Sequence, residues 1–231
     1  MSVYFISGID TAAGKSVAAG MLAKYLISTG KKVITQKLVQ TGCEGISEDI
    51  QTHRTIMGLP LLPEDTSGLT CSYIFKFPAS PHLAAGLEKR TVDPAVISAA
   101  TSRLAEIYDI VLLEGAGGLS VPLTLDVLTV DYLEQKQYPL ILVCSGRLGS
   151  INHALLSLET ARHRNIPVAG IIYNLFPAAD PVITADTRQV LRRGLKRFGY
   201  PESIVDMPAI PDLNNAGIID FSTLFKGDGN E

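Results

Sequence analysis

A glycine-containing segment near the start of the sequence combines the residue types that bind phosphate. It reads GIDTAAGKS over residues 8–16 and follows the apolar run Val3–Ser7. In such a loop, backbone N–H groups and the positive end of the following helix bind phosphate oxygens. Lys15 can neutralise charge on the β- and γ-phosphates, and the Ser16 hydroxyl can ligate Mg²⁺. The pattern predicts a nucleotide site, although five residues rather than four separate Gly8 from Gly14. The alternative is an ordinary strand–turn–helix with a chance Gly-Lys-Ser.

Two more charged residues follow predicted strands. Glu114 comes after the apolar run Ile110–Leu113 and before the sequence GAGG. A carboxylate at this position can hold Mg²⁺, and the glycines let a ligand approach the backbone closely. Lys37 follows the predicted strand 32–36. Taken alone it resembles a surface lysine, but beside an anionic site it supplies a second cation that helps two negatively charged reactants to meet.

The remaining acidic, histidine and cysteine residues give weaker signals. Asp49 begins a predicted helix over 49–57, where an acid serves either as a helix cap or as a second Mg²⁺ carboxylate. The histidines show no metal-ligand spacing, which favours surface or helix-cap roles for His53, His82, His153 and His163. Three cysteines without a C-x-x-C pair argue against zinc or a disulfide framework and favour a reducing compartment. Cys144 ends an apolar run, which predicts core packing.

The elements that position these residues alternate between short apolar strands and helices. Strands are predicted at 3–7, 32–36, 109–113, 139–144, 168–173 and 203–207, and helices at 16–29, 94–107, from about 150, and 181–198. Strands that are apolar throughout and separated by helices predict an α/β fold with a mostly parallel central sheet and helices on both faces. Ligands bind such sheets at the carboxyl ends of the strands. Residues 41–80 are the least regular, which is typical of a functional or a disordered segment.

Length and composition are ordinary for a soluble globular protein. The 231 residues suit one domain over 1–231, with 46% hydrophobic and 19% charged residues. The net charge of −3 argues against nucleic acid or an anionic membrane as the main partner. The longest apolar runs, such as Leu140–Cys144, are far shorter than the ~20 residues of a membrane helix. The N-terminus lacks a signal-peptide pattern, so a cytoplasmic protein is expected.

Taken together and in order, the motifs from about residue 2 to residue 210 resemble the dethiobiotin synthetase family. That family has the same longer phosphate loop, G-x-D-T-x-x-G-K-T, matching residues 8–16. Its K-P-V-x-[ST]-G matches residues 37–42, with Leu38 in place of the proline, and its E-G-A-G-G matches 114–118. Its S-P-H matches 80–82, and L-G-x-I-N-H-A matches 148–154. An asparagine after a late strand corresponds to Asn174, and I-P-x-L resembles residues 207–210.

The resemblance implies a P-loop ligase that acts on 7,8-diaminononanoate, CO₂ and ATP. One amine of the substrate and CO₂ form a carbamate, whose oxygen attacks the γ-phosphate and gives a carbamic–phosphoric anhydride. The second amine then closes the cyclic urea of dethiobiotin and expels phosphate, leaving ADP. Because carbamate and triphosphate are both anions, Lys15, Lys37 and Mg²⁺ must offset their repulsion. The family is a homodimer with the substrate lying across the interface.

The resemblance also assigns roles to individual residues. The catalytic residues are Thr11, Lys15 and Lys37, and the metal ligands are Ser16, Glu114 and Asp49, with Glu48 as an alternative to Asp49. The substrate contacts are Thr11, Lys37, Thr41, Gly118 and, from the second subunit, Ser150. The nucleotide contacts are Ala12, Ala13, Gly14, Lys15, Ser16, Val17, Asp49, Glu114, Gly115, Ala116, Gly117, Asn174, Pro208, Ala209 and Ile210.

Two other functions fit a phosphate loop of this kind. One is a partner-regulated ATPase switch of the same superclass, but such switches carry an additional lysine early in the loop, and residues 8–10 have none. The other is an amidotransferase-type synthetase of the same fold. Its glutaminase domain, with a nucleophilic cysteine, finds no room in 231 residues. The sequence therefore favours the dethiobiotin synthetase interpretation.

Overall fold

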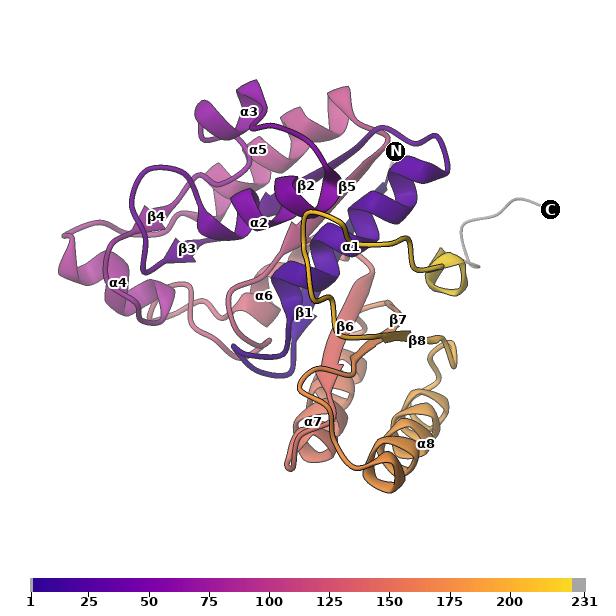
Figure 1. The fold of residues 1–231 in the computed structure, drawn as a ribbon. Coiled ribbons are helices and arrows are strands. Elements are labelled where there is room, and N and C mark those ends of the chain that lie inside the picture. The colour runs from indigo at the N-terminus through magenta and orange to yellow at the C-terminus, as the bar shows by residue number, and fades with distance from the viewer. Residues whose placement is uncertain (1, 226–231) are drawn as a thin grey trace.

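The computed structural model describes residues 2–225 and is organised around a six-stranded sheet (Figure 1). Its strand order is β2-β5-β1-β6-β7-β8, and each neighbouring pair runs parallel. The strands are β1 (Ser2–Gly8), β2 (Val33–Lys37), β5 (Ile110–Glu114), β6 (Leu140–Ser145), β7 (Val168–Asn174) and β8 (Ile204–Met207). A separate parallel pair joins β3 (Gln40–Thr41) to β4 (Ile74–Phe75).

Helices cover both faces of the sheet. They are α1 (Lys15–Ser28), α2 (Glu48–Met57), α3 (Pro63–Thr66), α4 (Pro81–Leu87), α5 (Pro94–Ile107), α6 (Thr129–Lys136), α7 (Ser150–His163) and α8 (Pro181–Arg197), followed by a 3₁₀ turn at Ser222–Phe225. The chain moves one way along the sheet from β1 to β2 and the other way from β2 to β8. Because crossovers between parallel strands are right-handed, α1 lies on one face and α5 to α8 on the other. α2 packs against α1.

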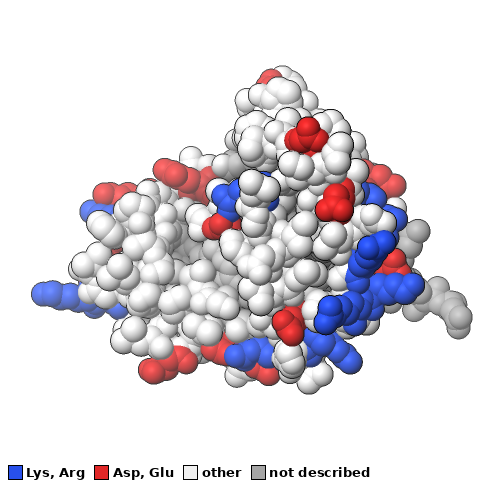
Figure 2. Space-filling view, turned by 90° about the horizontal axis from the view of Figure 1, so that it is seen from below, with Lys and Arg blue, Asp and Glu red and all other residues white. Residues whose placement is uncertain are grey.

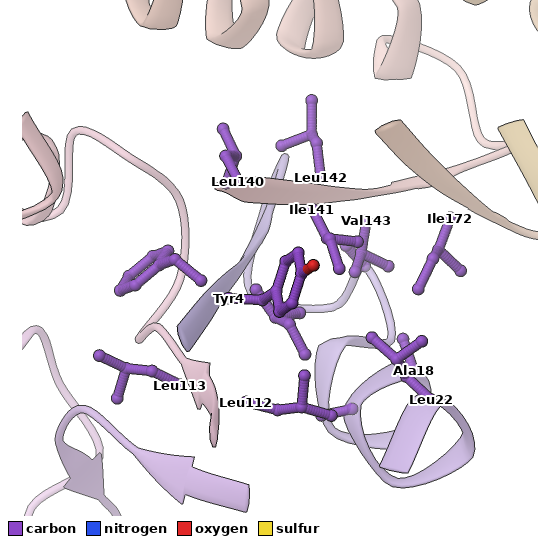
Figure 3. Close-up of a cluster of buried hydrophobic side chains, with 14 of the residues drawn as sticks. Tyr4, Ala18, Leu22, Leu112, Leu113, Leu140, Ile141, Leu142, Val143 and Ile172 are labelled. Atoms are coloured by element: carbon purple, nitrogen blue, oxygen red, sulfur yellow. The ribbon is translucent and has the colours of Figure 1, made fainter. Parts of the chain in front are cut away.

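The apolar strands form the core because both of their faces are covered. Figure 3 shows alternate side chains of β6 on opposite faces: Ile141 and Val143 on the side of α1, and Leu140 and Leu142 on the other. All four are buried. This two-sided burial explains why the strands are apolar throughout instead of alternating with polar residues.

The predicted strands and the helices with predicted ends agree with the observed ones to within one residue at either end. The predicted N-cap of α5 is confirmed, since the Asp93 side chain accepts a hydrogen bond from the N–H of Ala95. α2 begins one residue earlier than predicted and is capped by Ser47, so Asp49 lies in its first turn. The segment 41–80 holds β4, α2 and α3 and the end of β3, none of which except α2 was predicted. None of the helices formed by residues 2–225 is long and apolar enough to cross a membrane.

A buried ion pair fixes α2 against the sheet. The guanidinium of Arg54 donates to both carboxylate oxygens of Asp65, with N–O distances of 2.9 and 2.8 Å. Its Nη1 also donates to Thr35 Oγ1 on β2 at 2.8 Å. Both charged side chains are almost fully buried. The pair therefore joins α2, β2 and the start of α3 into one rigid unit.

Replacing Asp65 with asparagine is expected to lower the free energy of unfolding at pH 7 by roughly 3–5 kcal/mol, because Arg54 loses its charged partner. Burial alone raises the pKa of Asp65, but the hydrogen bonds from Arg54 outweigh it and hold the pKa below the usual 3.8. A carboxylate with a lowered pKa stabilises the fold fully above about pH 5 and less as the pH falls through its folded-state pKa. Urea unfolding at several pH values measures this. The difference in free energy of unfolding between the wild type and Asp65→Asn should become smaller in acid. A difference that stays constant contradicts a role for the Asp65 charge.

Candidate active site

The predicted site residues gather at the carboxyl ends of the central strands, the lower edge of the sheet in Figure 1. The phosphate loop follows β1, and Lys37 and Glu114 are the last residues of β2 and β5. These two strands pair with Lys37 opposite Glu114. Asn174 ends β7. Figure 2 shows the molecule from this end, where charged side chains lie mostly around the margin and broad areas between them are uncharged.

Lys15 lies across the phosphate loop. Its side chain is buried, and its ammonium donates to the backbone oxygens of Asp10 at 2.9 Å and Thr11 at 3.3 Å. Burial lowers the pKa of Lys15 to about 8, and the positive charge of Lys37 acts in the same direction. Gly14 has a φ of 93° and begins α1 without a side-chain cap, so the first N–H groups of the helix lie open to an anion. The loop is built to receive negative charge.

An acidic cluster lies beside the loop. The Ser16 Oγ is 2.8 Å from Asp49 Oδ1 and 3.0 Å from Glu114 Oε1. The ammonium of Lys37 forms ion pairs with both carboxylates, at 2.7 Å from Glu114 Oε1, and donates to the Gly115 oxygen at 3.2 Å. The structure therefore brings together Ser16, Lys37, Asp49 and Glu114, which come from four separate segments of the sequence.

The charges in this cluster hold one another in place. Burial alone lowers the pKa of Lys37, but the carboxylates of Glu114 and Asp49 outweigh it and raise that pKa above its usual range. Burial alone raises the pKa of Glu114, but the charge of Lys37 and the hydrogen bond of His53 hold it well below its usual range. Lys37 and Glu114 therefore form a buried pair with both members charged.

The cluster fits a hard divalent cation. Ser16, Asp49 and Glu114 present one hydroxyl and two carboxylates, and Mg²⁺ prefers oxygen ligands of this kind, completed by substrate phosphates. Between residues 2 and 225 there is no group of three or more His, Cys, Asp or Glu side chains that could hold a metal alone. The protein oxygens thus supply part of a coordination shell. Glu48, the alternative to Asp49, is exposed to solvent.

A pocket of about 750 Å³ adjoins the phosphate loop. The predicted nucleotide contacts that line it are Ala12, Gly14, Lys15, Ser16, Val17, Asn174, Pro208, Ala209 and Ile210. Asn174 connects the pocket to the loop, since its Nδ2 donates to the Ala13 oxygen at 3.1 Å and its Oδ1 accepts from the Phe176 N–H at 3.0 Å. The sequence reasoning did not name four further lining residues, Phe176, Pro177, Pro211 and Leu213. All four are apolar, so this part of the lining can pack against a flat apolar group.

A second cleft of about 420 Å³ opens on the other side of Thr11. It is lined by Ile9, Asp10, Thr11, Gly118, Leu119, Ser120, Val121, His153, Leu156, Ser157 and Thr160. Thr11 borders both this cleft and the larger pocket. Arg147 forms an ion pair with Asp10 at the rim. Two anionic reactants placed in the two cavities would therefore meet at the phosphate loop.

Several predicted contacts lie outside the two cavities. Gly115, Ala116 and Gly117 do not line the larger pocket, and Thr41 lines neither cavity. The Ser150 side chain is buried, with its Oγ 3.1 Å from Ser145 Oγ, and its N–H donates to the Arg147 oxygen at 3.1 Å.

The surface role expected for His53 is wrong. Its side chain is fully buried, and its Nε2 lies 2.8 Å from Glu114 Oε2. This contact could not be predicted from the sequence, because the two residues are 61 positions apart and lie on different elements. The apolar residue Ile50, one turn before His53 on α2, is also buried and marks the inward face of the helix.

Solved structures share this fold at low sequence identity. A ParA family ATPase from Chlorobium tepidum TLS aligns with a TM-score of 0.54 and 16% identity, over 98% of this chain and 92% of that one. Apo McdA from Cyanthece aligns with a TM-score of 0.54 and 14% identity, over 99% and 94% of the two chains. At these identities the similarity shows the fold alone.

Sequence relatives are much closer. Residues 2–216 match the AAA domain family. The ATP-dependent dethiobiotin synthetase BioD of Chlorobaculum tepidum is 53% identical over 216 residues, which cover 94% of this chain and 88% of that protein. The ATP-dependent dethiobiotin synthetase BioD 2 of Pasteurella multocida is 54% identical over 196 residues, covering 85% and 92% of the two chains. The chain belongs to the ATP-dependent dethiobiotin synthetase family.

Proposed function

We propose that this chain is an ATP-dependent dethiobiotin synthetase, acting as one catalytic domain. It converts 7,8-diaminononanoate, CO₂ and ATP into dethiobiotin, ADP and phosphate. The observation that carries the proposal is the junction of two cavities at Thr11, one beside the phosphate loop and one beside Gly118. The identity of 53% with a dethiobiotin synthetase from Chlorobaculum tepidum supports the same activity.

The nucleotide occupies the larger cavity, with its phosphates on the loop between Gly8 and Ser16. Backbone N–H groups at the start of α1 and the ammonium of Lys15 bind the phosphate oxygens. Because Lys15 is already desolvated, its attraction for phosphate is stronger than that of an exposed lysine. The base lies among the apolar side chains near Phe176 and Leu213.

The second substrate occupies the cleft beside Gly118. Its carbamate, formed when an amine nitrogen bonds to the carbon of CO₂ and loses a proton, is an anion that must approach the γ-phosphate. Lys37 stabilises the carbamate oxygen as it bonds to phosphorus and ADP leaves. The second amine then attacks the carbamate carbon, and the carbon–oxygen bond breaks to release phosphate. Thr11, at the junction, hydrogen-bonds to the carbamate or to the free amine.

Mg²⁺ fits beside the phosphates, held by Ser16, Asp49 and Glu114. When bound, it supplies positive charge that offsets the repulsion between triphosphate and carbamate. In the structure Lys37 already neutralises the same two carboxylates. Lys37 therefore has charged partners before the substrates arrive, and it can turn toward the carbamate once the carboxylates have another cation.

Asp49→Asn is expected to raise the Mg²⁺ concentration for half-maximal activity at least about tenfold, because a lost ligand charge weakens binding of a hard cation. Glu48→Gln is the matched control, since Glu48 is the neighbouring acid on α2 and is exposed. Titrating activity with Mg²⁺ for both variants measures the difference. A larger effect of Glu48→Gln assigns the ligand to Glu48 instead.

A homodimer is also proposed, with the substrate cleft at the interface. Leu148 is 89% exposed and Leu156 is 53% exposed, and Leu156 lines the cleft. An exposed apolar side chain in the wall of the cleft supports an interface there. Sedimentation velocity at micromolar concentration is expected to give twice the chain mass of 24.8 kDa, and a monomeric mass contradicts the proposed dimer.

A cytoplasmic location stays a prediction from the cysteine usage.

The activity is tested by phosphate release from Mg-ATP with and without bicarbonate and 7,8-diaminononanoate. Release is expected only when both are present, together with one dethiobiotin per phosphate. Release that needs neither addition supports the partner-regulated ATPase switch and contradicts the synthetase.

A further inference from the structure

His53 is buried beside the acidic cluster, yet the proposed chemistry gives it no task. Its Nε2 is 2.8 Å from Glu114 Oε2, and both side chains are fully buried. The other oxygen of the same carboxylate, Oε1, contacts Lys37 and Ser16. Each oxygen of Glu114 therefore has its own partners, and the carboxylate plane is fixed from both ends.

The two ring nitrogens of His53 have different surroundings. An imidazole nitrogen so close to a carboxylate oxygen carries the proton and donates it. The other ring nitrogen, Nδ1, is buried and has no hydrogen-bond partner among residues 2–225. Within residues 2–225, the His53 ring therefore makes one hydrogen bond, to Glu114.

Packing alone does not explain this side chain. An apolar residue such as leucine fills similar space without leaving a buried nitrogen unpaired. Compared with leucine, the imidazole adds one hydrogen bond, to Glu114. His53 also lies four residues after Asp49 on α2, so both project from the same face of the helix. One helix face thereby brings Asp49 to Ser16 and His53 to Glu114.

We propose that His53 is a positioning residue for phosphoryl transfer, holding Glu114 Oε2 so that Oε1 stays aimed at Ser16 and the phosphate loop. When Lys37 turns toward the carbamate, Glu114 loses its charged partner. The hydrogen bond from His53 then keeps the carboxylate from rotating away from Ser16. This inference rests on the proposed function and deepens it.

The test compares His53→Leu, which removes the donor, with His53→Gln, whose amide can donate from a similar position. Ile56→Val is the packing control, because Ile56 is buried on the same helix and its side chain lies against Gly20 of α1. Four quantities are measured: the melting temperature, kcat, KM for ATP, and the affinity for ADP with and without Mg²⁺ by calorimetry.

For His53→Leu, a fall of roughly 10–100-fold is expected both in kcat and in the gain of ADP affinity that Mg²⁺ provides, as for other residues that orient a metal ligand. The Mg²⁺-free affinity for ADP stays within about twofold, because the phosphate loop is untouched. His53→Gln recovers most of the loss. Ile56→Val lowers the melting temperature and leaves the Mg²⁺ gain unchanged.

The proposal is overturned if His53→Leu keeps the wild-type increase in ADP affinity on adding Mg²⁺. It is also overturned if His53→Gln loses as much of that increase as His53→Leu, or if Ile56→Val loses as much. The calorimetric readout needs no turnover. It therefore still decides the role of His53 if the wild-type protein proves not to make dethiobiotin, which would end the proposed function instead.

Discussion

Replacing Lys37 with glutamine is expected to lower kcat by about 10²–10³-fold while the affinity for ATP stays within a few-fold. The ammonium lies between two carboxylates at the end of β2, beside the phosphate loop and not in the nucleotide pocket. Its charge is therefore used when the carbamate oxygen bonds to phosphorus, more than when ATP binds. An interaction made mainly in the transition state appears in kcat and not in KM.

Three measurements test the prediction for Lys37→Gln. Initial rates give kcat, calorimetry gives the ATP affinity, and circular dichroism reports whether the variant is folded, since removing one member of a buried ion pair costs stability. Lys31→Gln, at an exposed position before β2, is the matched control and should behave as wild type. A Lys37→Gln protein that turns over at near wild-type speed excludes Lys37 from catalysis.

Glu114→Gln is expected to abolish most of the Mg²⁺-dependent gain in nucleotide affinity and to lower kcat by about 10²-fold or more. The carboxylate accepts hydrogen bonds on both oxygens, from Lys37 on one side and His53 on the other. A glutamine amide has one oxygen and one NH₂ group, so one of these donors would face another donor. An unpaired buried donor costs roughly 1–3 kcal/mol of folding stability.

Glu114→Asp is the control for charge, because it keeps the carboxylate on a shorter side chain. It should retain more of the Mg²⁺ gain than Glu114→Gln. Calorimetric titration of ADP at several Mg²⁺ concentrations measures both, together with urea unfolding. If Glu114→Gln keeps the wild-type Mg²⁺ dependence, the metal lies elsewhere and the acidic cluster has only a structural role.

The sequence predicts the central sheet well because its signals are local. Apolar runs such as Ile110–Leu113 are bounded by turns and helices, and Asp93 with Pro94 marks a helix start, so each element can be found from neighbouring residues alone. The parallel topology then follows from alternation of strand and helix. Because parallel strands end at one edge, Lys37 and Glu114 were expected near the phosphate loop, and the structure pairs them directly.

The contacts missed by sequence reasoning are non-local. His53 and Glu114 are 61 residues apart, and nothing in their local patterns marks them as partners. Arg54 and Asp65 resemble surface charges until the fold buries both in one ion pair. The strands β3 and β4 have only two residues each, too short for any periodic signal. Phe176 lies in the irregular segment between β7 and α8, where no periodic pattern predicts its place in the larger pocket.

The fate of the CO₂ oxygens tests the central claim most directly. The proposed reaction joins a carbamate oxygen to the γ-phosphorus and later breaks the bond between that oxygen and carbon, so phosphate must leave with one oxygen from CO₂. With C¹⁸O₂ supplied to Mg-ATP and 7,8-diaminononanoate, and short reaction times that limit exchange with water, the account predicts one ¹⁸O in each phosphate released. Phosphate that carries only oxygen from ATP and water would show hydrolysis at this site and contradict the account.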